Sequence, residues 1–173
     1  YSISDLARDG EVTWFGVRNY QARNYMRDHM KVDDLIIFYH SNGKPSGAVG
    51  IGKVMSLPYP DETQFDKKSK YYYPRATKEN PVWMLVDIGY VKTFERLVSI
   101  EEMRSHKELG KMTLLQKGSR LSITPVTEEE FTAFLAATAY QPAPCNPLLD
   151  KTWRSPGNGV VFPPGQADLP RQP

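Results

Sequence analysis

The sequence predicts a single α+β domain, in which a small bent sheet or partial barrel carries short helices on its outside. Three observations lead to this. Short strand patterns and short helix patterns follow one another in mixed order, without an internal repeat. Residues 35–39 are continuously apolar, as in a buried strand, and residues 82–94 are rich in Val, Ile, Trp and Tyr. Ser99 and Thr127 each begin a sequence typical of a capped helix.

The composition limits the classes of protein to consider. A chain of 173 residues, 40% of them hydrophobic, can bury a substantial domain core. The net charge of +2 excludes a polybasic nucleic-acid coat, so any nucleic-acid binding needs a local patch or a shaped pocket. The longest apolar runs are far too short to span a bilayer, and we expect no membrane partner.

The sequence carries little that indicates an enzyme, a metal site or a cofactor. Cys145 is the single cysteine, which excludes an intramolecular disulfide and a cysteine-rich metal site. The three histidines do not have the spacing of a zinc site, and the chain has no P-loop, dinucleotide-binding glycine pattern or nucleophile elbow. We therefore expect a binding protein that holds neither metal nor cofactor.

In the first half of the chain the patterns predict two helices and two strands. A polar cap begins a helical turn at residues 4–7, and an apolar stripe predicts a helix over 21–30. The buried strand at 35–39 leads through a glycine-containing turn at 41–47 into a second strand over 48–55.

In the second half the patterns predict a long loop, two strands and two helices. The loop covers residues 58–81, and a stretch of that length without regular structure usually means function or mobility. The regular elements are a strand over 82–94, a helix over 99–105, a strand over 121–126 and a helix that Thr127 opens together with Glu130.

The composition changes near residue 140, which divides the chain into a domain at 1–138 and a proline-rich tail at 139–173. Prolines and scattered glycines predict that the tail is either disordered or extended over the domain. The apolar residues of the tail either anchor it or bind a partner, or belong to an extension without a role: Trp153, Val160, Val161 and Phe162.

Residues 16–24 are the most informative stretch for function. Asn19 and Gln21 carry paired donors and acceptors that can read a base edge, and Arg18 and Arg23 carry planar cations suited to phosphate or to base stacking. The same side chains can instead form a solvated helix face and fix the loop through bonds to the backbone. We interpret the stretch as one wall of a nucleotide-binding pocket.

Three further groups are candidates for that pocket. They are the strand-end residues His40, Ser41 and Asn42, the turn residues Tyr59, Pro60 and Asp61, and Arg120 before the last strand. A histidine at such a strand end is more often a structural hydrogen-bonding group than a ligand. Tyr59 either stacks on a base, a contact worth ~1–3 kcal/mol, or packs a rigid turn onto the core. Arg120 either completes the pocket floor or bridges strands.

Two other features have alternative interpretations. Asp87 lies inside an apolar strand, so its carboxylate needs a partner; an ion pair with Arg120 or Arg18 is favoured over acid–base catalysis. Residues 67–70 form a basic run beside three consecutive tyrosines, which is typical of a solvated loop and is also consistent with contact to a nucleic-acid backbone.

Four separated motifs resemble the EVE domain family in order and content: residues 16–24, 38–42, 59–61 and 120–127. The resemblance covers residues 1–138 and implies a PUA-like fold, a curved mixed sheet or small barrel with short helices, related to YTH and ASCH domains. It implies that Val17, Arg18, Asn19 and residues Gln21, Ala22 and Arg23 form the pocket wall, with His40 to Asn42 as its edge and Tyr59 to Asp61 as its lip. Family members normally open with a further, central strand, so we expect the chain to be truncated before Tyr1 or another segment to take that place.

The resemblance further implies a module that reads a modified base, most often a modified cytosine in DNA. The alternatives are an RNA-binding domain in the manner of PUA and YTH domains, and an ASCH-like hydrolase of modified nucleosides built on Asp87 or Asp61. The expected partner is nucleic acid, DNA rather than RNA. The expected location is the cytoplasm for a bacterial protein and the nucleus for a eukaryotic one.

Overall fold

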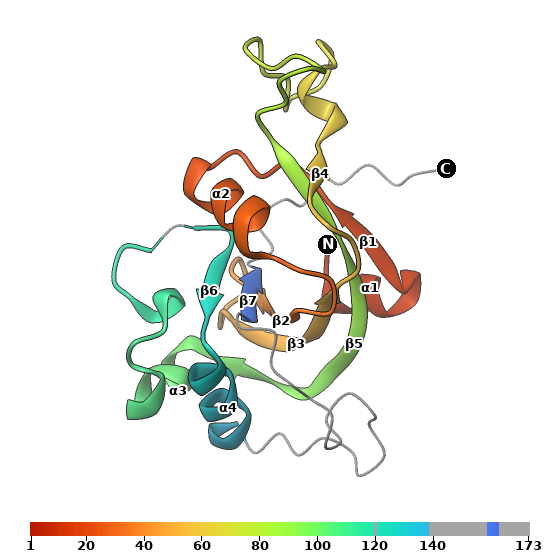
Figure 1. Cartoon of the computed structure of the whole chain (residues 1–173). Helices are drawn as coiled ribbons and strands as arrows, with labels where there is room; N and C mark the ends of the chain where they lie inside the picture. Colours follow the sequence, from red (N-terminus) through yellow and green to blue (C-terminus); the bar gives the residue numbers. More distant parts are fainter. Residues whose placement is uncertain (120, 139–158, 163–173) are drawn as a thin grey trace.

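The computed structural model describes residues 1–119, 121–138 and 159–162. These residues form one β-sheet with helices packed around it (Figure 1). Its strands lie in the order β1-β5-β3-β2-β7-β6, and the short β4 pairs with β5 beside this path. All pairings are antiparallel except that of β2 with β7. The strands are β1 Glu11–Trp14, β2 Leu35–His40, β3 Gly47–Val54, β4 Tyr59–Pro60, β5 Met84–Ser99, β6 Thr124–Val126 and β7 Gly159–Phe162.

The structure confirms the predicted α+β class, with a bent sheet that is not closed into a barrel among the described residues. It also confirms the predicted helices, whose bounds are α1 Ile3–Asp9, α2 Tyr20–His29, α3 Ile100–Ser105 and α4 Glu128–Ala137. The Ser99 side chain accepts a hydrogen bond from the Glu102 amide, and Thr127 forms the predicted capping box with Glu130. The described residues also form three short 3₁₀ helices, which are η1 Glu62–Gln64, η2 Lys107–Leu109 and η3 Thr113–Leu115.

Strand bounds differ from the predictions at three places. Strand β1 was missed, because only Val12 and Trp14 in its four residues are apolar. Strand β5 begins two residues later than predicted and continues five residues beyond Phe94, past the charged residues Glu95 and Arg96. Strand β6 is shorter than predicted, and the long loop contains β4 and η1.

The pairing of β3 with β5 contains irregularities, which bend a sheet. Their register shifts twice, between Ala48 and Gly50 and between Ile51 and Gly52. A Cβ at Gly50 would lie 2.4 Å from the Lys92 carbonyl oxygen and 2.8 Å from the Ile3 side chain. Glycine is therefore required here, because it lets β3 approach β5 while α1 packs across it.

The bent sheet buries apolar side chains on both faces. Strand β2 shows this directly, since Ile36 and Phe38 join one core cluster, whereas Ile37 and Tyr39 join another. The first cluster is covered by α1, β1 and α2, and the second by α3 and α4. This confirms the prediction that the continuous apolar run forms a fully buried strand.

The tail supplies one described element. Strand β7 runs parallel to β2 and antiparallel to β6, so it connects β6 to the rest of the sheet. A segment of the predicted tail thus pairs with β2, on the side of β2 away from β3. Predictions for the remaining tail residues fall outside the described part of the chain, and the domain boundary at residue 138 stays a prediction.

Candidate functional site

The predicted pocket wall lies between the end of β1 and the first turn of α2. Asn19 is the N-cap of α2: its Oδ1 accepts hydrogen bonds from the Gln21 amide at 2.9 Å and the Ala22 amide at 3.1 Å. This local geometry begins the helix, and Asn19 is exposed. The structure therefore assigns the Asn19 oxygen to the backbone, which is the structural alternative considered above.

The residues of this wall face two different directions. Val17 and Ala22 are almost completely buried in the core cluster beneath α2, so they anchor the segment. The exposed side chains at the start of the helix are Asn19, Tyr20, Gln21 and Asn24. The helix N-terminus contributes a partial positive charge at the same place.

Arg18 is held by its neighbours through all five of its N–H groups. Nη1 donates to Asp61 Oδ2 at 2.8 Å and to the Val17 carbonyl, and Nη2 donates to Thr63 Oγ1 and the Tyr71 carbonyl. Nε donates to the same Tyr71 oxygen at 3.2 Å. In this conformation the guanidinium has no donor left for a phosphate, so the geometry supports a structural role for Arg18.

Asp61 is completely buried at the other end of this ion pair. Its Oδ2 also accepts from the Gly16 amide, and its Oδ1 accepts from the amide and hydroxyl of Thr63. The carboxylate thus caps η1 and joins residues 16–18 to the loop after β4. All four of these contacts would have to be rearranged before Asp61 could serve as the base of a hydrolase.

An aromatic cluster surrounds Arg23 beside this pair. Arg23 Nη1 donates to the Val82 carbonyl at 2.6 Å, and its Cζ lies 5.1 Å from the Tyr20 ring centre. Tyr20 lies 4.8 Å from Trp83 between ring centres, and its hydroxyl is hydrogen-bonded to that of Tyr73 at 2.8 Å. Sequence reasoning left Tyr20 out of the site, although it lies between Asn19 and Gln21 and half of its surface is exposed.

His40 lies against α1, at its first residue Ile3. Its Nε2 accepts from the Ile3 amide at 3.3 Å, and its ring lies 5.8 Å from that of Phe38. The Phe38 ring in turn contacts Trp14 at 5.9 Å, so two buried rings link His40 to the start of the candidate wall. Ser41 and Asn42 are exposed in the turn that follows. A pocket bounded jointly by both patches stays a prediction.

Tyr59 and Asp87 form a separate hydrogen-bonded group on the sheet. Pro60 and Tyr59 make up β4, and the Tyr59 hydroxyl donates to Asp87 Oδ1 at 2.8 Å. Thr13 Oγ1 donates to the same oxygen at 2.8 Å. The predicted ion pair of Asp87 with Arg18 is therefore wrong, because hydroxyl groups satisfy this half-buried carboxylate while Arg18 bonds Asp61. Arg120 lies outside the described residues.

The described residues contain no group of three or more His, Cys, Asp or Glu side chains that could hold a metal ion. Within the same part of the chain, no helix is both long enough and apolar enough to cross a membrane.

Comparison with known proteins places these features in a family. The family model of the EVE domain matches residues 1–137. Mouse thymocyte nuclear protein 1 is 40% identical over 153 residues, which cover 83% of this chain and 67% of the mouse protein. A crystal structure of a protein from Pseudomonas putida is 43% identical with a TM-score of 0.75, covering 79% of this chain and 91% of that one.

A further similar structure contains DNA. It is human THYN1 in complex with DNA that contains 5-methylcytosine, 39% identical to this chain with a TM-score of 0.74. The match covers 82% of this chain and 88% of the human one.

The bent, mostly antiparallel sheet with short helices on both faces defines this protein as a small α+β domain. Within that class, the chain belongs to the EVE domain family.

Replacing Arg18 tests the structural role of its ion pair. We expect Arg18→Met to lower the free energy of unfolding by about 3 kcal/mol, because it leaves the buried Asp61 carboxylate without its cation. Urea unfolding measures the loss. The matched control is Arg27→Met, which breaks an exposed pair with Asp28 and should change stability by less than about 0.5 kcal/mol. Equal small losses in both variants would show that the Arg18 network does not stabilise the fold.

The position of His40 predicts a pH dependence of stability. Burial lowers the pKa of His40 below its ordinary value of 6.5, so the folded state favours the neutral ring that accepts from Ile3. The unfolded chain binds the proton at higher pH, so this stability is present above pH 6.5 and is lost as the pH falls toward the folded pKa. Urea unfolding at pH 7.5 and about pH 5.5 should show the loss.

Two variants separate this effect from general acid destabilisation. His40→Gln keeps an acceptor for the Ile3 amide and should show a smaller loss between the two pH values than the unsubstituted protein. His29→Gln, at an exposed position, should keep the full loss. An unchanged pH dependence in His40→Gln would contradict the assignment.

Proposed function

We propose that this protein binds DNA and recognises a modified cytosine through the surface at the start of α2. The observation that carries this proposal is the similarity to the human protein crystallised with 5-methylcytosine-containing DNA, which extends over 82% of the chain. The EVE domain match over residues 1–137 includes the segment that holds Asn19 to Arg23. The geometry of this segment supports the proposal independently.

The exposed groups at the start of α2 have the chemistry that base recognition requires. The side-chain nitrogen of Asn19 and the amide group of Gln21 supply donors and an acceptor for a base edge. Tyr20 offers a half-exposed ring whose orientation is fixed by Tyr73 and Trp83. A base stacked on such a ring gains ~1–3 kcal/mol.

Buried residues hold these groups in place. Val17 and Ala22 anchor the segment in the core, whereas Arg18 and Arg23 fix it to the loop after β4 and to Val82. A surface that is already ordered loses little further conformational freedom on binding. We also assign Ser41, Asn42 and Tyr59 to this site: Ser41 and Asn42 are exposed in the turn after β2, and Tyr59 is exposed in β4.

The recognised base would be flipped out of the DNA duplex, because contacts with the protein can offset the cost of unstacking it. Flipping a nucleotide costs a few kcal/mol, which stacking and hydrogen bonds to the base edge offset. The methyl group of 5-methylcytosine adds ~1–3 kcal/mol when it enters an apolar niche. The expected discrimination is therefore moderate, and shape rather than charge produces it.

Binding to matched oligonucleotides tests the proposal. We expect the full chain to bind a duplex with one central 5-methylcytosine at least about tenfold more tightly than the unmethylated duplex, because the methyl group adds apolar contact. Fluorescence anisotropy at two salt concentrations measures both affinities. Equal, purely salt-dependent binding to the two duplexes would contradict the proposal that the protein recognises the modified base. Tighter binding to the RNA of the same sequence would favour the RNA-binding alternative, since only RNA offers a 2′-hydroxyl.

Asn19 allows the contact with the base to be separated from folding. Asn19→Asp keeps an oxygen that can cap α2, so stability should stay within about 0.5 kcal/mol of the original. The variant loses the amide donor and adds a negative charge, so binding to the methylated duplex should weaken at least about tenfold. Thr132→Glu, which adds the same charge at an exposed position of α4, is the control and should bind as before. Unchanged affinity in Asn19→Asp would exclude Asn19 from the site.

A further inference from the structure

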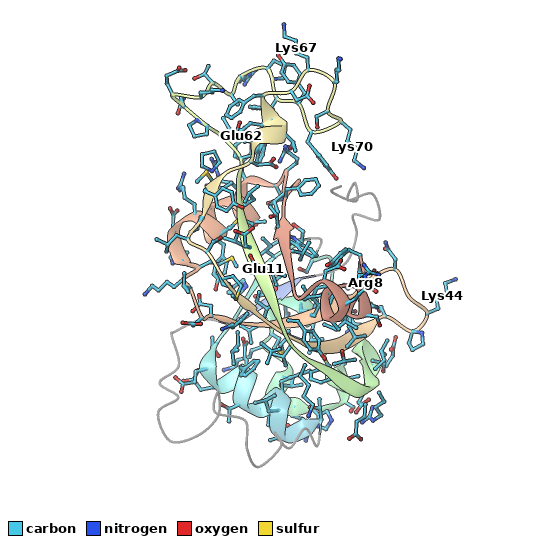
Figure 2. The ribbon with its side chains drawn as sticks, turned by 90° about the vertical axis from the view of Figure 1, so that its right-hand side faces the viewer. Arg8, Glu11, Lys44, Glu62, Lys67 and Lys70 are labelled. Carbon is cyan, nitrogen blue, oxygen red and sulfur yellow. The ribbon has the colours of Figure 1, made fainter. Side chains whose placement is uncertain are left out.

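A basic lobe projects from one end of the molecule. It consists of residues 62–80, between β4 and β5, and stands above the sheet at the top of Figure 1. Figure 2 shows Lys67 pointing outward from its far end and Lys70 at its side. The proposed base-recognition surface lies at the foot of the lobe and does not include these lysines.

The foot of the lobe is braced by a buried amide. Gln64 is completely buried, and its Oε1 accepts from the Val82 amide at 2.9 Å and the Trp83 amide at 2.8 Å. Its Nε2 donates to the Trp83 carbonyl at 2.9 Å, and its own carbonyl accepts from the Tyr73 amide at 2.9 Å. The segment that enters the lobe is therefore hydrogen-bonded to the segment that leaves it.

The far end of the lobe is also ordered by turns. The Asp66 carbonyl accepts from the Ser69 amide at 2.9 Å, and its carboxylate accepts from the Lys68 amide at 2.9 Å. Ser69 then accepts from the Tyr71 amide through its hydroxyl and from the Tyr72 amide through its carbonyl. The lysines at 67 and 68 thus project from a backbone with a defined conformation.

The charges of the lobe are largely unneutralised. Residues 62–80 contain five basic and three acidic side chains, an excess as large as the net charge of +2 of the whole chain. The exposed cations Lys67, Lys68, Arg75 and Lys78 form no salt bridge within the part of the chain that the structure describes. By contrast, three exposed arginines of the body are each paired with a nearby carboxylate: Arg8, Arg27 and Arg96.

The lobe is joined directly to the start of α2. The Tyr73 hydroxyl bonds that of Tyr20, and the Tyr71 carbonyl accepts from Arg18 at 2.9 Å. These hydrogen bonds fix the lobe relative to Tyr20, so a long ligand bound at Tyr20 could contact the lobe as well. Unpaired cations on a rigid support beside a base-binding surface suit a polyanion that extends away from that surface.

We propose that the basic lobe binds the sugar–phosphate backbone of DNA next to the recognised base, through Lys67 and Lys68. This inference rests on the proposed function and adds to it a second surface with a different role. The lysines supply affinity that is independent of sequence and methylation, because they pair with phosphates and release counterions. Recognition of the base stays with the start of α2.

The test compares two double variants of the full chain. Lys67→Gln/Lys68→Gln removes two charges from the lobe, whereas Lys107→Gln/Lys111→Gln removes two exposed charges near α3, at the opposite end of the view in Figure 1. The affinity of each for methylated and unmethylated duplexes is measured by anisotropy between about 50 and 200 mM salt. None of these four side chains makes a salt bridge with a described residue, and all four are exposed, so thermal unfolding should be unchanged.

We expect the lobe variant to bind both duplexes more weakly by the same factor. The slope of log affinity against log salt should fall by about 1.8, at about 0.9 for each lost phosphate contact, and the ratio of methylated to unmethylated affinity should not change. The control variant should keep the original slope. A lobe variant that matches the original protein in slope and affinity overturns the proposal, as does an equal loss in the control.

The same measurements distinguish failure of this inference from failure of the proposed function. If the unsubstituted protein discriminates between the duplexes and the lobe variant binds both with the same affinity and salt slope, the proposed contact of the lobe with DNA is wrong. Recognition of the modified base is then still supported. If the unsubstituted protein does not discriminate, base recognition fails. A reduced slope in the lobe variant would then still support contact of the lobe with the DNA backbone.

Discussion

The ion pair between Arg18 and Asp61 is the interaction on which the arrangement of the candidate site depends. It joins the segment after β1 to the loop after β4, across 43 positions of sequence. Because Asp61 is completely buried, its charge is tolerated only with the four donors that Gly16, Arg18 and Thr63 provide. The pair therefore sets the position of α2 and of the basic lobe together. A protein that lost it would lose the relation between the two surfaces proposed to contact DNA.

Local signals in the sequence were sufficient for much of the fold. The caps at Ser99 and Thr127 act within three residues of their helices, and the continuous apolar run predicted β2 with its two buried faces. Strand β1 was missed because its stability comes from pairing with residues 86–89, far along the chain. No local pattern encodes that register. Strand β5 exceeded its prediction because the exposed, charged Glu95 and Arg96 interrupt the apolar signal, whereas the backbone pairing continues to Ser99 and Val98 is buried again.

The candidate site was predictable in its chemistry and less so in its geometry. The polar composition of residues 16–24 indicated the β1–α2 connection as a candidate site, but it could not show which arginine donors were already used. The partner of Arg18 depends on a tertiary contact, and so does the neutral environment of Asp87 between Thr13 and Tyr59. Tyr20 was overlooked because a tyrosine beside helix-capping residues carries no signal of its own until Tyr73 and Trp83 are placed around it.

The nine residues 16–24 divide their roles by the direction in which each side chain points. Asn19 caps α2 and so fixes the rotation of the helix. That rotation turns Ala22 into the core and Arg23 toward Val82, and it leaves Gln21 and Asn24 exposed. Supporting side chains and side chains proposed to contact DNA thus alternate within one short segment. The effect of a substitution there depends on the side of α2 on which the residue lies. Substitution of a residue that faces the core or Val82 alters stability first, whereas substitution of an exposed residue alters the proposed binding surface while the fold remains intact.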